Sequence, residues 1–505
     1  MSGARDPRSA AAFDERELPR RRLLGDEIGP RRRRLLAAAV AVPWLGMSGA
    51  PASAQGAVYS EADLAHAARL RDAAQLDGRA LDLVRGLSRE VGARPAGSPG
   101  DVKAVAWAQT QLSALGLAAV RAEPLALRVW RRGPASAELI AAERHPLVLA
   151  ALGNSVGTPA PGLEAEIAYY ADFAALRADS SERARGRIVF VDQRTERSRD
   201  GSGYGRAVPA RFGSAVEAAK RGALAVVIRS IGTDTERVAH TGAMRYDDAA
   251  AQIPAVAVSV PDADLIARLH AAAPAVPLRL RLQVANLLGV EAQTHNVIAD
   301  VPGTDLADEV VLIGAHLDSW DLGEGAADDA AGVGIVSAAA ALIQRLGSEG
   351  GRRPRRTIRV VLFGNEENGF DGAREYGQRY RDQHHQLVGE SDFGAGAIYR
   401  LRSRSDAAAL PAFAAMAGVL APLGVAAGDN NGSPGPDAAW LVRRHGWAGV
   451  ELSQDGSSYF DVHHTVNDTF ERLDTRALPQ CVACWAVVAW LAAQAPMRFG
   501  GLVRS

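Results

Sequence analysis

The sequence predicts an α/β protein in which a mainly parallel mixed sheet carries helices on both faces and a second α/β domain is inserted into the first. Two patterns predict this fold class. From His295 onward, apolar strand-like runs alternate with helical runs, which is typical of a parallel sheet covered by helices. Between about residues 130 and 280, short β-rich runs replace this alternation and indicate a separate folding unit. A chain of 505 residues also exceeds what one ordinary core usually holds.

The first 54 residues predict a secretory signal peptide. Four arginines at 31–34 precede an apolar stretch at 35–47 and a small-x-small cleavage site that ends at Ala54, the usual order in such signals. The long charged start leaves two alternatives open, a later translation start or a twin-arginine export route. The apolar stretch is shorter than the roughly 20 residues of a membrane-spanning helix, and no other stretch suggests a span. We therefore expect a periplasmic or secreted protein with no stable membrane span after cleavage.

Residues 55–130 are expected to form the first part of the main domain and to begin with helices. Apolar residues recur with helical spacing over residues 61–90. The Pro- and Gly-rich residues 95–100 then predict a loop before another helix at 102–115.

Residues 131–285 are expected to form the inserted domain. The runs at 188–191 and 225–228 predict buried strands, and one clear helix is predicted at 214–221. This segment holds none of the acid and histidine clusters described below, so we expect it to shape a cleft or to mediate association.

Residues 286–505 complete the main domain. Strands are predicted at 296–300, 310–313 and 357–363, and helices at 332–345 and from near Gly372. In open sheets of this kind, ligands bind beyond the carboxyl ends of the strands. The polar residues that follow these strands are therefore candidates for a functional site.

His316 and Asp318 follow the strand predicted at 310–313. In an extended chain, residues two apart point to the same face. A metal-binding histidine usually donates its other ring N–H to a carboxylate or a carbonyl, which fixes its tautomer. His316 could therefore bind a metal while Asp318 orients its ring, although a polar strand end would explain this triplet alone equally well.

Two pairs of acids follow the same strands. Asp328 and Asp329 lie in the loop before the predicted helix, where a carboxylate can also favour a helix N-terminus. Glu366 and Glu367 follow the strand at 357–363, and because adjacent side chains diverge, one can bind a metal while the other acts as a general base.

The last candidates lie in two later loops. Asp392 follows an apolar run, where a lone aspartate is most often a turn residue, and His463 and His464 share a polar loop with Asp468. Together with the earlier residues they supply two imidazoles and at least three carboxylates. This is the ligand inventory of a two-zinc hydrolytic site, and manganese or cobalt would also suit it.

Charge and cysteine content restrict the other functions. The formal net charge of −1 argues against a nucleic-acid partner. The chain has only two cysteines, Cys481 and Cys484, in an apolar segment with helical character. Without a second pair they indicate helix packing rather than a zinc or redox motif, and a disulfide between them stays open.

Long motifs extend the comparison beyond single residues. They are WRRGPASAEL, LGNSVGTPAPGLEAE, SAVEAAKRGALAVVIRS, AHTGAM, GAHLDSWDLGEGAADDAAG, NEENGFDGAREY, ESDFG and YFDVHHTVNDTF. In these motifs the chain resembles the zinc aminopeptidase family that uses co-catalytic metals, and most closely its carboxypeptidase Q-like members, over nearly everything after the signal peptide. The resemblance implies a zinc exopeptidase fold for the main, catalytic domain and a protease-associated domain for the insertion.

The resemblance also implies five metal ligands and a cofactor of two zinc ions. His316 and Asp392 match the ligands of one zinc, and Glu367 and His464 match those of the other. Asp328 matches the carboxylate that bridges both metals. The family pattern of a histidine directly before Thr or Ser selects His464 rather than its neighbour.

Two catalytic roles follow from the same resemblance. Asp318 matches the partner that orients His316, and Glu366 matches the general base. Asp329 follows the bridging residue in a peptide that the family holds in the cis form. Residues 430–437 depart from the family in a substrate-side loop, so no side-chain preference is carried over.

We therefore expect an exported dizinc metallo-exopeptidase that hydrolyses short peptides, above all unblocked dipeptides, through a metal-bridged hydroxide with Glu366 as general base. The family further implies a homodimer. Two alternatives remain: a single-zinc, glutaminyl-cyclase-like aminoacyltransferase, and a non-catalytic, receptor-like binding protein. The complete ligand set favours the hydrolase.

Overall fold

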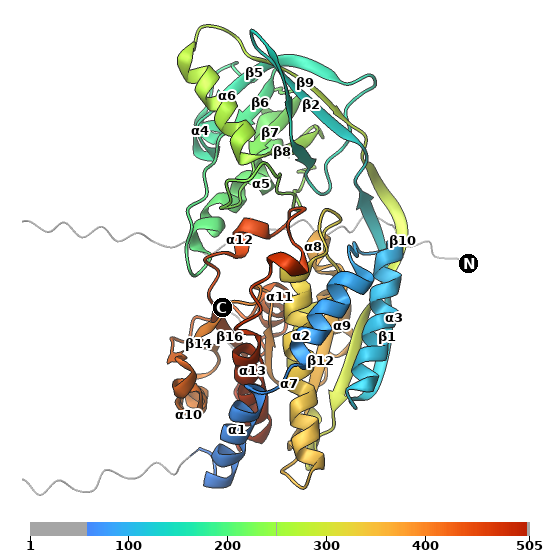
Figure 1. The fold of residues 1–505 in the computed structure, drawn as a ribbon, viewed down its shortest axis with the longest axis vertical. Helices are drawn as coiled ribbons and strands as arrows, with labels where there is room; N and C mark the ends of the chain where they lie inside the picture. The colour runs from blue at the N-terminus through green and yellow to red at the C-terminus, as the bar shows by residue number, and fades with distance from the viewer. Residues whose placement is uncertain (1–57, 249, 502–505) are drawn as a thin grey trace, which may run out of the picture. The chain divides into compact units, whose positions relative to one another are not determined.

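The computed structural model describes residues 58–248 and 250–501 (Figure 1). The predicted signal peptide lies outside these residues. The described chain contains two eight-stranded mixed sheets. All strands of the second sheet fall between β1 (Ala118–Arg131) and β10 (Leu287–Val301) of the first, and these two long strands run side by side in Figure 1. The protein is therefore an α/β protein.

The first sheet has the strand order β1-β10-β12-β11-β13-β16-β14-β15. Its remaining strands are β11 (Leu306–His316), β12 (Arg356–Phe363), β13 (His385–Glu390), β14 (Ile398–Arg404), β15 (Ala426–Ala427) and β16 (Gly449–Gln454). The four central strands, β12, β11, β13 and β16, are parallel. β1 pairs antiparallel with β10, β10 with β12, and β14 with β16, whereas β15 pairs parallel with β14. Four of the seven strand pairings are parallel, so the sheet is mixed and mainly parallel, as the sequence predicted, while β10 returns from the second sheet and runs antiparallel to β12.

Helices cover both faces of this sheet because alternate strand residues point to opposite sides. In β11, Val311 and Ile313 pack into one core and Val310 and Leu312 into another. The first core includes residues of α1 (Glu61–Ala74), α2 (Arg79–Gly86), α3 (Pro99–Ala114), α7 (Ala331–Ser348), α10 (Leu410–Leu420) and α13 (Leu478–Gln494). The second includes residues of α9 (Asp371–Arg379) and α11 (Pro436–His445).

The N-terminal helical region is divided. The helical spacing over residues 61–90 corresponds to α1, α2 and one further turn at Leu87–Val91, with the break at residues 75–78 before Arg79. α3 begins earlier than the sequence predicted, because the Ser98 hydroxyl accepts a hydrogen bond from the Asp101 amide and Pro99 occupies the first turn.

The second sheet lies within residues 131–285 and has the strand order β3-β2-β9-β5-β6-β7-β8-β4. Its strands are β2 (Ala135–Ile140), β3 (Arg144–Leu147), β4 (Leu149–Ala151), β5 (Leu163–Tyr170), β6 (Ile188–Val191), β7 (Ala225–Arg229), β8 (Ala255–Val258) and β9 (Arg279–Val284). α4 (Phe173–Ala178) and α5 (Ser202–Lys220) pack on one core, and α6 (Val260–Ala272) packs on another.

The expectation of one clear helix in this segment was wrong, since the described residues form three. α5 is much longer than the predicted run at 214–221, and its first half contains Pro209 and two glycines, Gly203 and Gly205, which conceal the helical pattern in the sequence. We refer to residues 131–285 below as the inserted segment.

Two apolar helices bear on the sequence analysis. Among the described residues, Ala326–Ser348 is long and apolar enough to cross a membrane, with a mean hydropathy of 1.5, which the sequence analysis did not anticipate. Its apolar window is 100% buried inside the protein, as in the core helix of a soluble domain. In α13, Cys481 and Cys484 are buried and free, so they pack the core and form no disulfide with each other.

Candidate metal centre

The predicted site residues lie beyond the carboxyl ends of three neighbouring parallel strands. β11 ends at His316, and β12 is followed by the short helix α8 (Glu366–Gly369). β13 ends at Glu390, just before Asp392. Because parallel strands end at the same edge of a sheet, these side chains meet there.

Asp328 lies between two histidines from distant parts of the chain. Its Oδ1 is 2.9 Å from Nε2 of His316, and its Oδ2 is 3.1 Å from Nε2 of His464. All three side chains are buried. One carboxylate therefore faces two imidazoles, one with each oxygen.

Each histidine has a second carboxylate beside the same nitrogen. Nε2 of His316 is 3.5 Å from Asp392, and Nε2 of His464 is 3.1 Å from Glu367. The structure thus brings the five predicted ligands into two groups that share Asp328. Among the described residues, three overlapping groups could hold a metal ion: His316 with Asp328 and Glu367, His316 with Asp329 and Asp392, and Asp328 with His463 and His464.

His463 occupies a different position from His464. The two rings stack with their centroids 3.5 Å apart, and Nε2 of His463 is 3.4 Å from Asp328. Nε2 of His464 faces both Asp328 and Glu367, whereas Asp328 is the only carboxylate within 4.0 Å of the His463 ring nitrogens among the described residues. This geometry agrees with the choice of His464 as the ligand, and that choice stays a prediction.

Asp318 contacts both His316 and the predicted base. Nδ1 of His316 is 3.0 Å from the backbone carbonyl oxygen of Asp318 and 3.8 Å from its carboxylate. That carboxylate accepts hydrogen bonds from the amides of Glu366 at 3.0 Å and Glu367 at 3.4 Å. Asp318 can therefore orient the His316 ring through its carbonyl while its carboxylate holds the start of α8.

The loop around Asp328 is held by two further acids. The peptide between Asp328 and Asp329 is cis. Asp329 accepts hydrogen bonds from the amides of His316 at 3.2 Å and Gly332 at 2.9 Å. Asp468 accepts from the amides of Ala327 at 2.6 Å and Asp328 at 3.2 Å.

Burial and charge shift the pKa values of the acids in opposite directions. Burial raises the pKa of Glu366 well above its ordinary value, and the carboxylates of Asp392 and Glu367 raise it further. Burial also tends to raise the pKa of Asp328, but hydrogen bonds from His316 and His464 hold it well below its ordinary value.

Two buried acids were not singled out by the sequence analysis. Burial and the nearby Asp392 raise the pKa of Glu390 to about 8. Asp437, in the first turn of α11, is fully buried, and burial together with Glu390 raises its pKa. In the sequence, Glu390 is a strand end and Asp437 an ordinary helix-start acid, so neither gives a functional signal.

Two buried arginines were also missed. The side chain of Arg94 is fully buried and reaches the loop after His316, and Arg211 of the inserted segment lies beside His464. Both donate to backbone carbonyls of distant loops. A single arginine with such partners leaves no pattern in the sequence.

The donor set fits divalent metal ions. Glu367 Oε1 and Asp392 Oδ1 are buried without a hydrogen-bond partner, an arrangement that calls for a cation. Imidazole nitrogens and carboxylate oxygens without thiolates suit zinc, with both histidines presenting Nε2 to the shared carboxylate. The residues present therefore fit two zinc ions.

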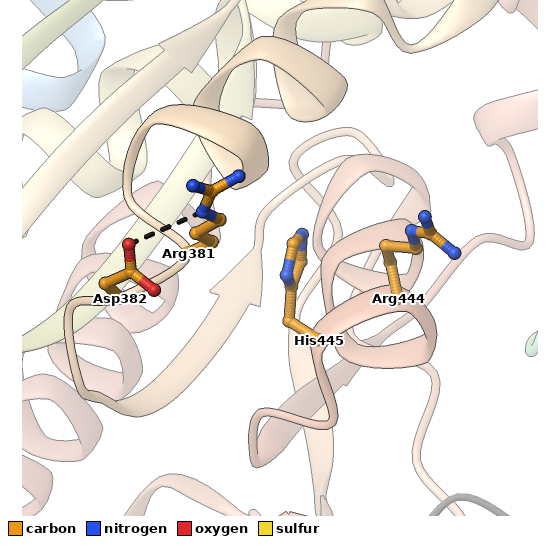
Figure 2. Close-up of a pocket in the computed structure, with 4 residues that line it drawn as sticks. All are labelled: Arg381, Asp382, Arg444 and His445. Atoms are coloured by element: carbon orange, nitrogen blue, oxygen red, sulfur yellow. Dashed lines mark hydrogen bonds and ion pairs between the residues drawn. The ribbon is translucent and has the colours of Figure 1, made fainter.

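A separate pocket holds none of these residues. It is lined by Arg381, Asp382, Arg444 and His445, with Arg381 paired to Asp382 at 3.4 Å (Figure 2). These residues follow α9 or end α11. Both helices begin beside the strand ends of the centre, where Asn365 donates to Asp371 and the amide of Ala438 donates to Glu390. The pocket is therefore at the opposite edge from the strand ends that carry the acids and histidines.

Comparison with known proteins identifies the family. The sequence model of peptidase family M28 matches residues 296–489. Human carboxypeptidase Q is 34% identical over 405 residues, which span 80% of this chain and 83% of the human protein, and mouse carboxypeptidase Q is 33% identical over the same lengths. The chain belongs to peptidase family M28. This family consists of zinc metallopeptidases, and the present M28 chain is a carboxypeptidase Q-like member, which confirms the resemblance drawn from the motifs.

Solved structures support the M28 assignment. The crystal structure of a peptidase M28 precursor from Shewanella amazonensis SB2B is 44% identical in sequence, with a TM-score of 0.83. The match covers 88% of this chain and 99% of the Shewanella chain. The aminopeptidase from Aneurinibacillus sp. strain AM-1 is 19% identical with a TM-score of 0.58, covering 87% of this chain and 98% of its own, which shows the shared fold alone.

Proposed function

We propose that this M28 peptidase is an exported dizinc exopeptidase that hydrolyses short peptides with free ends, dipeptides in particular. The position of Asp328 carries the proposal. Its two carboxylate oxygens face Nε2 of His316 and Nε2 of His464, as a carboxylate that bridges two metals must. His316 and Asp392 would hold one zinc, and Glu367 and His464 the other.

Two zinc ions bound here would supply Lewis acidity, lowering the pKa of water and polarising the substrate carbonyl. Glu366 is the residue we assign to proton transfer. Its side chain belongs to none of the candidate metal-binding groups among the described residues, and its amide is fixed by the Asp318 carboxylate. A carboxyl whose pKa is raised by burial can take a proton from the attacking water and return it to the leaving amine.

The substrate class is an inference from the family. The relatives include a carboxypeptidase and an aminopeptidase, so the name does not decide which peptide terminus is recognised. Thr241 and Arg211 of the inserted segment lie against His464, so this segment borders the centre. The preference for short peptides is carried over from the family resemblance.

Three accompanying proposals complete the assignment. The inserted segment, a mixed sheet with helices on both faces, is proposed to be the family's protease-associated domain. Export is proposed from the signal pattern of residues 1–54. A homodimer is proposed from the family alone, and light scattering of the purified enzyme would test it.

One assay tests the central proposal. The purified enzyme is incubated with zinc and a dipeptide library, together with N-acetylated and C-amidated controls, and its zinc content is measured. Hydrolysis with about two zinc ions per chain supports the proposal, and the blocked substrates reveal the terminus. Cyclisation of glutaminyl substrates with one zinc per chain would instead support the aminoacyltransferase alternative.

A further inference from the structure

The inserted segment is hydrogen-bonded to the loop that carries His464. The amide of Thr241 donates to the carbonyl oxygen of His464 at 3.0 Å. The amide of Thr233 donates to the carbonyl oxygen of Phe460 at 3.0 Å. Backbone pairing thus joins the second sheet's connecting loops directly to the metal-centre loop.

Side chains of α5 reach His464 and the neighbouring His463. Arg211 is 6% exposed, and its Nη1 lies 3.4 Å from Nδ1 of His464 and 2.5 Å from the hydroxyl of Tyr204. The Tyr204 ring stacks on Phe460 at 4.2 Å and meets His463 edge-on at 5.1 Å. The rings of this loop are therefore packed against the inserted segment.

Two ion pairs hold the ends of the loop. Arg197 contacts both carboxylate oxygens of Asp461, at 2.6 and 2.8 Å. Glu236 pairs with Arg472 at 2.9 and 3.0 Å. Such part-exposed ion pairs usually contribute no more than about 1 kcal/mol each to the free energy of unfolding. They therefore fix the position of the loop more than they stabilise the protein.

His464 needs this external support. Its backbone φ is 62°, in the left-handed region that side-chain-bearing residues rarely adopt. A residue in that region persists only where its surroundings enforce it. The amide of Thr241 supplies that constraint at the carbonyl oxygen of His464.

The same residue of the inserted segment faces the His464 ring. Nδ1 of His464 is 3.4 Å from the carbonyl oxygen of Thr241, on the side away from the carboxylates. A proton on Nδ1 directed at this carbonyl leaves the lone pair of Nε2 free toward Asp328 and Glu367. In this tautomer Nη1 of Arg211, 3.4 Å from Nδ1, packs against the ring without a hydrogen bond to it. Arg211 holds the adjoining peptide, since its Nε donates to the carbonyl of Ala243 at 3.1 Å.

We propose that the inserted segment is a working part of the metal centre, in which Thr241 and Arg211 are positioning residues that set the backbone and ring orientation of His464. The inference rests on the proposed role of His464 as a zinc ligand. This role differs from that of a domain that only covers the substrate cleft. Changes in a covering domain would alter the affinity for substrate, whereas changes in a supporting domain alter the affinity for zinc.

Zinc affinity of the full-length protein tests this inference. We expect Arg211→Met to weaken one of the two zinc sites by roughly 10- to 100-fold, the usual effect of removing a group that supports a metal ligand, and to leave the other site unchanged. Arg211→Lys should recover part of the affinity. Competition with a chelator gives the two dissociation constants, and the visible spectrum of the cobalt-substituted protein reports the ligand geometry.

Arg221→Met is the matched control. Arg221 caps the same helix, about 15 Å along its axis from Arg211, and donates to Glu217 and to the backbone carbonyls of Arg177 and Asp179. The zinc affinities and the cobalt spectrum of the Arg221→Met variant should equal those of the wild type.

The outcomes separate the inference from the proposed function. A wild-type protein that binds no zinc would contradict the proposed function itself. A wild-type protein with two zinc ions and an Arg211→Met variant with unchanged affinities but a raised KM would overturn only the inference. If Arg211→Met does not fold, Arg211→Lys decides, because it keeps the buried cation but loses the Nε that donates to Ala243. Zinc affinities equal to those of the wild type in that variant would also overturn the inference.

Discussion

The Nε of Arg94 donates a hydrogen bond of 2.6 Å to the backbone carbonyl of Leu317, the residue directly after His316. The same guanidinium donates to the carbonyls of Glu324 at 2.7 Å and Gly325 at 2.9 Å. One fully buried cation therefore closes both ends of the loop that joins His316 to Asp328.

Replacing Arg94 should destabilise this loop. Arg94→Met keeps the aliphatic stem but leaves three carbonyl oxygens without their donor, so we expect the free energy of unfolding to fall by on the order of 3 kcal/mol. Urea unfolding measures it. The control is Arg85→Met, at a half-exposed arginine of α2, which should cost less than about 1 kcal/mol. Equal losses in the two variants would contradict the role of Arg94.

Glu366→Gln separates catalysis from metal binding. The amide keeps the size of the side chain and the contact of the Glu366 backbone with Asp318, but it cannot accept the proton of water. We expect two zinc ions to be retained and kcat to fall by roughly 100- to 10,000-fold. Elemental analysis and dipeptide hydrolysis measure the two effects, and a variant with ordinary kcat would refute the assignment of the base.

His316→Ala should remove metal as well as activity. The change deletes the nitrogen that lies 2.9 Å from Asp328 and 3.5 Å from Asp392, so the metal site on that side loses its imidazole ligand. We expect the zinc content after dialysis to drop by at least one ion per chain. Full occupancy in this variant would argue against a ligand role for His316.

Much of this centre could be predicted because local patterns determine it. The buried strand that ends at His316 has an apolar run at 310–313, and the strand before Glu366 ends in the apolar run 360–363, so their carboxyl ends locate the functional edge of the sheet. The inserted segment was harder, since Pro209 and the glycines of α5 conceal half of a helix. Its strand at Ile188–Val191, an uninterrupted apolar run, was predicted with its correct bounds.

The supporting contacts could not be predicted. Arg94 lies 223 residues from Leu317 in sequence, and Arg211 lies 253 residues from His464. Such contacts depend on tertiary packing, and a backbone carbonyl as partner imposes no residue type on the other side. The left-handed backbone of His464 is likewise invisible, because a histidine gives no conformational signal of the kind that a glycine gives.

The stability of the protein should depend on the buried imidazole of His385. Nδ1 of His385 is 3.0 Å from the carbonyl of Gln383, Nε2 is 2.8 Å from the hydroxyl of Tyr376, and the ring stacks on Trp447 at 3.7 Å. Burial lowers its pKa from 6.5 to about 3. The native state therefore excludes a proton that the unfolded chain binds below pH 6.5.

The sign of the effect follows from proton linkage. Between pH 6.5 and about 3 the unfolded state binds more protons at this site, so stability falls as pH falls, by about 1.4 kcal/mol per pH unit at most. His385→Gln cannot titrate, and we expect urea unfolding at pH 6.5 and 4.5 to show a smaller loss for the variant, by up to about 3 kcal/mol. Parallel losses would show that His385 is not the group responsible.

The tight contact between α7 and the loop after β13 should make Gly332 irreplaceable. A Cβ on Gly332 would lie 1.9 Å from the carbonyl oxygen of Ser391 and 2.4 Å from both carboxylate oxygens of Asp329. Either the peptide before Asp392 or the carboxylate that holds the amide of His316 must then move. Gly332→Ala should therefore lower the free energy of unfolding by about 1–3 kcal/mol, despite the better helix propensity of alanine, and should reduce zinc content.

Gly347→Ala in the same helix is the control. A Cβ there would lie 3.4 Å from its nearest neighbouring atom, so the change should be neutral or slightly stabilising. If urea unfolding and elemental analysis found the two variants alike, the close approach of α7 to Asp329 and Ser391 could not be what sets the spacing of the centre.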